Sequence, residues 1–212
     1  MGCKRVKRKE YLSDPCGASS LAFWKTNSIS VPPNLLILRE DDSRLGELCD
    51  MGTDTPYFKL LHPMECVDCP ALPKGFRFVL PDEGALSEHI AACYRSERAS
   101  ASELAACRLR PTFSPDLWLG IVDETTDKIV ASGIAELDTD ICEGILEWVQ
   151  VSPAYRRQGF GRLIVCELLA RLQGRANFVT VSGKENDPLT PRALYERCGF
   201  GGGVVWHILQ RV

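Results

Sequence analysis

The chain has 212 residues, of which 45% are hydrophobic, and its formal net charge is −3; this length allows one substantial core with a small extra lobe. The acidic balance, with a pI of about 5.7, excludes the overall basic field with which nucleic-acid-binding proteins attract phosphate backbones. We therefore expect no nucleic-acid partner, and a cationic, amine-bearing substrate suits the charge better.

Residues 1–9 are basic but no apolar run follows them, because Ser13, Asp14 and Pro15 come within a few residues. This start does not fit a secretory signal, and Val6 stands where a myristoylation motif requires Ser or Thr. No window approaches the roughly 18 consecutive apolar residues of a membrane-spanning helix. We therefore expect a soluble, cytoplasmic protein without a membrane partner.

In the first third of the chain, residues 34–39 and 57–61 are predicted to be strands set in irregular, proline-bearing connections. Residues 70–75, Pro-Ala-Leu-Pro-Lys-Gly, interrupt regular structure and divide the chain. We expect residues 1–75 to form an extension packed on the core and residues 76–212 to form the main domain. The sequence of the extension indicates no chemistry of its own.

The ten cysteines belong to a mid-sized chain without an export signal, so reduced thiols are expected. Cys66 and Cys69 have the spacing of a metal site. A zinc site needs about four ligands, however, and only His62 and Cys49 lie nearby in the sequence. We expect no metal. His62, His89 and His207 are too scattered to suggest a catalytic triad and are predicted to be structural.

After residue 75, strands and helices follow one another with short connections. A helix begins at about residue 83, with Leu86, Ile90 and Cys93 on one face, and a short helix follows near residues 103–108. The expected strands before and after these helices are residues 76–80, 117–123, 128–137 and 144–152, the last three joined as antiparallel neighbours.

Residues 160–173 are predicted to form an amphipathic helix, because Val165, Leu168, Leu169 and Leu172 recur at helical spacing. Residues 178–182 are expected to be a strand. Thr190 is predicted to be the N-cap of a last helix, with Pro191 at its first position and Gly199 at its end. Residues 203–210 close the chain as a strand, which completes a mixed sheet with helices on its faces.

Between the strand 144–152 and the helix 160–173, the sequence Arg156-Arg157-Gln158-Gly159-Phe160-Gly161-Arg162 combines glycines with three arginines. A glycine-rich loop that enters a helix aims free backbone N–H groups at one point, where the helix dipole favours an anion. The loop is therefore a candidate phosphate site, and the alternative is an ordinary turn with a solvated basic face. Ile164 stands where a dinucleotide motif requires a third glycine, and no nucleotide-triphosphate loop is present.

This loop resembles the Arg/Gln-x-x-Gly-x-Gly/Ala signature of the GNAT superfamily of acyl-CoA-dependent N-acetyltransferases. Downstream, Asn186, the run Ala193-Leu194-Tyr195 and the pair Gly199-Phe200 are similar to a second stretch of that family. The two motifs stand in the family's order, and the resemblance covers about residues 76–212. It implies an α+β (mixed α/β) fold, with a central, mostly antiparallel mixed sheet, helices on both faces and an N-terminal extension.

The resemblance implies acetyl-CoA as co-substrate and direct acetyl transfer to a primary amine of an unidentified acceptor, and it is compatible with a homodimer. Backbone groups of the strand 144–152 would hold the pantetheine arm, and N–H groups of the loop would hold the pyrophosphate. The helices at about residues 83–108 would line the acceptor groove, together with the strands near Trp206. The residues expected to bind the cofactor are Val149, Gln150, Val151, Arg156, Arg157, Gln158, Gly159, Phe160, Gly161, Arg162 and Asn186.

Two side chains are candidates for proton transfer. Deprotonating a lysine-like amine at pH 7 costs about 4.6 kcal/mol and an α-amine only about 1 kcal/mol, so the need for a base depends on the acceptor. Glu147 is the candidate base, because strand alternation places it on the face of Val149 and Val151; Glu136 and Glu143 are weaker alternatives, and a surface carboxylate is the plainer interpretation. Tyr195 matches the tyrosine that the family often uses as general acid for the CoA thiolate, the alternative being a packed aromatic.

Two other functions stay open at this point. The chain could be a regulatory module that binds acyl-CoA without turnover, or an interaction protein in which the first 75 residues act and the transferase fold is a scaffold. The acceptor amine and the acyl chain length are not indicated by the sequence.

Overall fold

The structure, a computed structural model, describes residues 6–49, 52–94 and 97–211, except for the side chains of residues 27, 49 and 211. It has two compact units. The first comprises Met1–Pro63 with Thr180–Val212, and the second comprises Met64–Val179. Over the described residues there are eight strands, in the order β3-β4-β5-β6 in the second unit and β7-β2-β8-β1 in the first. The expected division at residue 75 stays a prediction about which part carries the activity.

The second unit contains an antiparallel meander. Its four strands are those expected from the sequence, with small differences at the ends: β3 (Phe76–Val79), β4 (Trp118–Asp123), β5 (Lys128–Asp138) and β6 (Glu143–Val151). Short turns join the last three strands, and β7 (Phe178–Lys184) begins in this unit before it continues into the first.

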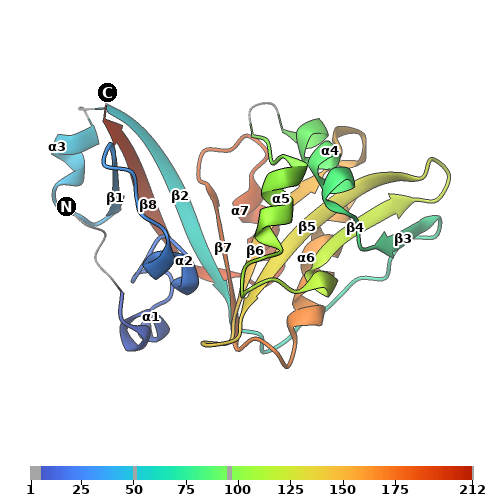
Figure 1. Ribbon diagram of the computed structural model, residues 1–212, viewed down its shortest axis with the longest axis horizontal. Helices are drawn as coiled ribbons and strands as arrows, with labels where there is room; N and C mark the ends of the chain where they lie inside the picture. Colours follow the sequence, from blue (N-terminus) through green and yellow to red (C-terminus); the bar gives the residue numbers. More distant parts are fainter. Residues whose placement is uncertain (1–5, 50–51, 95–96, 212) are drawn as a thin grey trace. The chain divides into compact units, whose positions relative to one another are not determined.

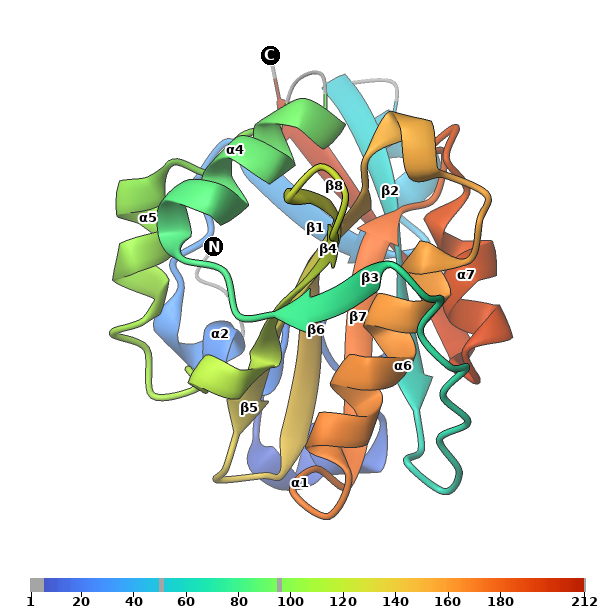
Figure 2. The same ribbon diagram turned by 90° about the vertical axis from the view of Figure 1, so that its right-hand side faces the viewer.

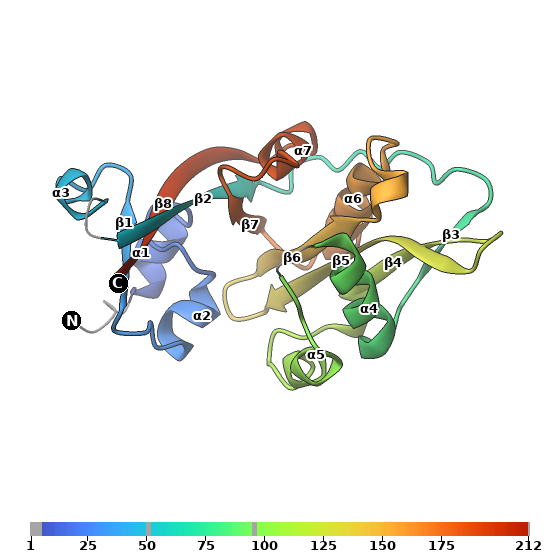
Figure 3. The ribbon, with the colours of Figure 1, turned by 90° about the horizontal axis from the view of Figure 1, so that it is seen from above.

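Helices cover both faces of this meander. The helices α4 (Glu83–Cys93) and α5 (Ala101–Cys107) lie on one face, and α6 (Phe160–Leu172) lies on the other (Figures 2 and 3). The first two begin where side chains cap them: Asp82 accepts from the N–H of Ala85, and Ser100 and Glu103 form a reciprocal capping box.

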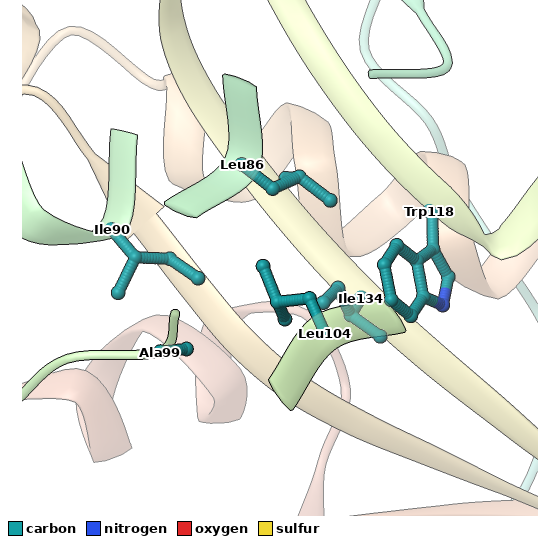
Figure 4. Close-up of a cluster of buried hydrophobic side chains, with 6 residues drawn as sticks. All are labelled: Leu86, Ile90, Ala99, Leu104, Trp118 and Ile134. Atoms are coloured by element: carbon teal, nitrogen blue, oxygen red, sulfur yellow. The ribbon is translucent and has the colours of Figure 1, made fainter. Parts of the chain in front are cut away.

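The face under α4 and α5 has its own apolar cluster, in which Leu86 and Ile90 of α4 meet Leu104 of α5 over Ile134 and Trp118 of the strands (Figure 4). Leu86 and Ile90 are fully buried, as the helical spacing predicted. Burying a side chain of this size contributes roughly 1.5–3 kcal/mol to folding, so the cluster fixes both helices on this face.

The opposite face admits α6 because it carries glycines where the helix packs most closely. A Cβ on Gly133 of β5 would lie 2.6 Å from Ile164 Cγ2 and 3.1 Å from Leu168 Cδ1, both on α6. The predicted amphipathic pattern of this helix is confirmed, since Leu168 and Leu172 are fully buried. On its polar side, Arg171 and Glu167 form an ion pair at 2.8 Å.

The first unit joins both ends of the chain in one sheet (Figure 1). The last strand β8 (Gly201–Arg211) lies between β1 (Leu35–Arg39) and β2 (Gly52–His62), and it is antiparallel to both. Three short helices of this unit carry too few turns for a periodic pattern and were not expected from the sequence: α1 (Arg8–Ser13), α2 (Phe23–Ser28) and α3 (Leu45–Cys49).

A buried lysine of β2 binds the N-terminal segment, residues 11–21. Lys59, with 1% of its surface exposed, donates from Nζ to the carbonyls of Pro15, Ser19 and Leu21 at 2.8, 3.0 and 2.7 Å. Its Nζ also lies 3.0 Å from the hydroxyl of Tyr11. A buried ammonium without hydrogen-bond partners is strongly destabilising, so these acceptors explain how the strand tolerates it.

The last helix, α7 (Pro191–Arg197), begins and ends where the sequence predicted. Pro191 takes the first position, and Gly199 has a φ of +92° just past the end. Thr190 occupies the N-cap position, but its backbone is left-handed, with a φ of 50°, and its side chain makes no capping hydrogen bond. Thr190 is therefore the N-cap residue, as predicted, but it does not cap the helix through its side chain.

Across the described parts of the chain, every helix is too short or too polar to cross a membrane.

Deleting residues 1–63 is expected to unfold the first unit, because β8 would lose both strands that pair with it and β7 would lose β2. Exposed strand edges of this kind aggregate. Soluble yield, circular dichroism and sedimentation would measure the effect, with deletion of residues 1–6 as the control. A folded, monodisperse protein after the longer deletion would contradict this dependence.

Candidate active site

The strand β6 contains one extra residue at Trp148. Glu147 pairs with Ile134 of β5 and Gln150 pairs with Ser132, so Trp148 and Val149 together stand opposite the single residue Gly133. Trp148 has a φ of 50°, a left-handed conformation that costs a non-glycine residue roughly 1–2 kcal/mol. The irregularity is a β-bulge, a feature that often lies next to active sites because it redirects side chains.

The bulge changes which face of β6 carries Glu147. From the sequence alone, side chains were expected to alternate regularly along this strand. Residues directly opposite one another in an antiparallel pair share a face. Glu147 therefore shares the face of Ile134, under α4 and α5, whereas Val149 lies against Gly133 and α6. The prediction that Glu147 and Val149 share a face is wrong, because an inserted residue reverses the period-2 pattern beyond it.

Tyr94, at the C-terminal end of α4, holds the bulge from the α4 face. Its ring meets that of Trp148 edge-on, with centroids 6.1 Å apart, and its hydroxyl donates to the carbonyl of Val149 at 3.2 Å. Both rings pack against the apolar cluster under α4 and α5. These contacts compensate the backbone strain at Trp148.

The segment from β6 to α6 has the geometry of an anion site. Arg157 has a φ of 63°, and Gly159, the N-cap of α6, has a φ of +92° that favours glycine. The first helical hydrogen bond runs from the N–H of Leu163 to the carbonyl of Gly159, so the N–H groups of residues 160–162 precede it. In an α-helix such N–H groups have no intrahelical acceptor, and the helix dipole adds positive potential there.

A carboxylate anchors the beginning of this loop. Tyr155, in the short 3-10 turn η2 (Pro153–Tyr155), donates its hydroxyl to Asp123 Oδ2 at 2.7 Å. Hydrogen bonds from Thr125, and then from Tyr155, lower the pKa of Asp123 to about 2. The ring of Phe160 lies 5.9 Å from that of Tyr155, so aromatic contacts hold the loop on both sides of Arg156 and Arg157.

The three arginines of the loop differ in what they contact. Arg156 turns inward: its Nε donates to the carbonyl of Val151 at 3.1 Å and its Nη2 to that of Cys93, in α4, at 2.9 Å. Arg157 is exposed, and Arg162 lies 3.7 Å from Asp68 with nearly half of its side chain exposed. The guanidinium of Arg156 is therefore used within the protein, whereas Arg157 and Arg162 reach solvent.

A buried polar chain beside the loop includes His89, for which the sequence indicated only an isolated structural role. Gln150 Nε2 donates to Ser132 Oγ at 2.5 Å, and Ser132 Oγ in turn lies 2.8 Å from His89 Nδ1. His89 Nε2 lies 3.0 Å from Ser152 Oγ, which donates to the carbonyl of Ile129 at 3.3 Å. Spacing alone could not reveal the chain, because it joins three elements.

Burial keeps His89 neutral. Its desolvation lowers the pKa from 6.5 to about 4. The neighbouring thiol of Cys93, 3.5 Å from Nε2, has its pKa raised to about 11, also by burial. The chain therefore works as a neutral hydrogen-bonded connection between α4, β5 and the end of β6.

The remaining candidate carboxylates of this unit lie deep in the protein. Glu136, with 4% of its surface exposed, forms an ion pair with Arg110 at 2.6 Å. Glu143 is fully buried at the start of β6. Glu147 is only half-buried, so it is the most accessible of the three.

Tyr195 and Asn186 belong to the first unit, whereas β6 and the loop after it belong to the second. Tyr195 is 6% exposed in α7, where its ring contacts Phe58 of β2 and Phe200, with centroids 6.1 and 5.7 Å away. Asn186 is exposed in the turn after β7.

No group of three or more His, Cys, Asp or Glu side chains in the described segments could hold a metal ion. Cys66 and Cys69 are exposed free thiols, and the side chain of Cys49 lies outside the described residues.

Replacing His89 by glutamine is expected to reduce the loss of unfolding free energy between pH 6.5 and 4. The native state binds the His89 proton only near pH 4, whereas the unfolded chain binds it near pH 6.5. Stability is therefore complete above pH 6.5 and falls between pH 6.5 and 4, by about 3 kcal/mol at 1.36 kcal/mol per pKa unit. Urea unfolding at several pH values would measure it, and an unchanged slope in the variant would contradict the assignment.

Part of the chain matches a known protein family. Residues 116–201 match the family described as acetyltransferase (GNAT) domain. No curated protein matches the chain.

Solved structures share the fold. A GCN5-related N-acetyltransferase from Sphaerobacter thermophilus gives a TM-score of 0.69 at 17% identity, over 84% of this chain and 60% of its own. A Drosophila protein gives a TM-score of 0.61 at 17% identity, over 91% of this chain and 67% of its own. The ribosomal-protein-S18-alanine N-acetyltransferase of Escherichia coli gives a TM-score of 0.51 at 17% identity, over 65% of this chain and 95% of its own. The chain thus spans only 60% of the length of the first structure. The expected fold class, a mostly antiparallel sheet with helices on both faces, is confirmed.

Proposed function

We propose that the chain, of which residues 116–201 match a GNAT acetyltransferase domain, transfers an acetyl group from acetyl-CoA directly to a primary amine. The observation that carries the proposal is the loop after β6, where consecutive N–H groups precede the first hydrogen bond of α6. Such a cradle suits the pyrophosphate of CoA. The solvent-accessible Arg157 and Arg162 would add charge to it, and Arg156 would hold the loop in shape.

The cofactor arm would run along β6 beside the bulge. Backbone groups of Val149, Gln150 and Val151 are the proposed contacts. The carbonyls of Val149 and Val151 also accept from Tyr94 and Arg156, so the arm would meet a strand whose backbone is held by these two side chains. The side chain of Gln150 is buried in the chain of His89, so its part would be limited to the backbone.

Glu147 is proposed as the general base, directly or through a water. It lies on the α4 and α5 face, the side on which the family resemblance places the acceptor. A carboxylate there can attract an ammonium group and accept its proton before attack on the thioester. Tyr195 is proposed as the general acid that protonates the departing thiolate, since a phenol of pKa near 10 can donate to a thiolate of similar basicity.

An acceptor screen with Tyr195→Phe as its control tests the reaction. Wild-type protein mixed with acetyl-CoA and a panel of polyamines, amino acids, peptide N-termini and aminoglycosides should release free thiol with at least one class. The phenylalanine variant should lose roughly 100-fold or more in kcat while still binding CoA, because only the proton donor is removed. Binding of CoA without thiol release from any amine would favour a regulatory acyl-CoA-binding module.

Glu147→Gln is expected to lower kcat/KM for a lysine-like acceptor by about 100-fold at pH 7, and by less as the pH approaches the pKa of the amine. The physical reason is that a neutral amine needs no base. The exposed turn residue Glu124 supplies the matched control, Glu124→Gln. A wild-type pH profile in the Glu147 variant would remove this residue from the mechanism.

A further inference from the structure

The strand β2 belongs to the part of the chain for which the sequence indicated no role, and its two faces carry different contacts. Lys59 reaches the N-terminal segment around Tyr11. Phe58, one residue earlier, therefore lies on the opposite face, where its ring meets Tyr195 of α7. Because β2 stands between β7 and β8 in the sheet, Phe58 reaches the second family motif from a distant part of the sequence.

The ring of Phe58 occupies space that is open because residue 183 of β7 is glycine. The side chain is fully buried, and a Cβ on Gly183 of β7 would lie 2.6 Å from Phe58 Cζ and 3.0 Å from Cε1. From this seat the ring lies with its centroid 6.1 Å from that of Tyr195, at an interplanar angle of 57°. Phe200 provides a second aromatic contact at 5.7 Å. The ring of Tyr195 is thus held by aromatic neighbours from β2 and from the turn before β8.

We infer that Phe58 is a positioning residue for Tyr195, through which the strand β2 takes part in the reaction. The inference rests on the proposed role of Tyr195 as general acid. It assigns a function to β2 that lies outside residues 116–201, the part of the chain that matches the family.

The helix that carries Tyr195 depends on such external support. With seven residues, α7 has fewer than two full turns, and its N-cap Thr190 makes no side-chain capping bond. A proton donor must stay within about 2.6–3.2 Å of its acceptor, and a displacement of about 1 Å can cost about 100-fold in rate. Packing against Phe58 restricts the phenol to one orientation, as aromatic pairs prefer defined edge and offset geometries.

A double-mutant cycle tests the inference. Phe58→Leu should lower kcat about tenfold or more and leave the KM for acetyl-CoA within about twofold, because leucine fills the site without the aromatic contact. In a Tyr195→Phe background, the same substitution should have no further effect on kcat. The acceptor is the best amine from the screen, or water, read as slow acetyl-CoA hydrolysis, if no amine reacts.

Leu60 supplies the matched control. It lies on the same face of the same strand, is 1% exposed, and packs at Gly203, where an added Cβ would lie 2.8 Å from Leu60 Cδ2. Leu60→Val should lower the melting temperature without the selective loss of kcat. Equal losses of kcat from Phe58→Leu in both backgrounds would overturn the positioning role. If Tyr195→Phe alone left kcat unchanged, the proposed acid would fail, which is a separate result.

A measurement without turnover completes the test. The chain has five tyrosines, so 3-fluorotyrosine labelling gives few ¹⁹F resonances, and the one lost in Tyr195→Phe belongs to Tyr195. Its resonance should shift and broaden in Phe58→Leu and stay in place in Leu60→Val. An unchanged resonance in the Phe58 variant would overturn the inference independently of any kinetic result.

Discussion

The extra residue in β6 is the constraint on which the candidate site depends. It separates one strand into two parts with opposite orientations, so that Glu147 lies under α4 and α5 whereas Val149 lies against α6. A regular strand would put both side chains on one face, and an acceptor base and a cofactor contact would then compete for the same side. The strained backbone at Trp148 persists because Tyr94 holds it through a ring contact and a hydrogen bond.

Buried polar groups connect this bulge to the loop that follows. The chain from Gln150 through His89 to Ser152 fixes the last turn of α4 against the end of β6, and Arg156 closes the same gap by donating to Cys93 and Val151. Each of these groups would be costly if unpaired, so together they select one arrangement of strand and loop. The N–H groups of residues 160–162, which precede the first hydrogen bond of α6, follow directly on this loop.

Much of the second unit could be predicted from the sequence, because its signals are local. Periodicity identified α4 and α6, and turn residues separated the strands of the meander. The bulge could not be predicted, since one inserted residue leaves no trace in composition and reverses every later assignment of face. The roles of His89 and Arg156 were missed for another reason: their partners Ser132 and Cys93 are 43 and 63 residues away in the chain. Likewise, nothing local to residues 57–61 indicates that they pair with the last strand.

The pairing of β2 with β8 also bears on whether the N-terminal part of the chain is a separate module. A separable N-terminal module would need its own core. In β2, however, Lys59 contacts Tyr11 on one face and Phe58 contacts Tyr195 on the other. One face receives the N-terminal segment through carbonyls gathered around a buried ammonium, and the other supports the helix that carries Tyr195. Loss of the segment would leave the ammonium of Lys59 without those acceptors. Adjacent residues of β2 therefore contact the N-terminal segment and the helix that carries Tyr195.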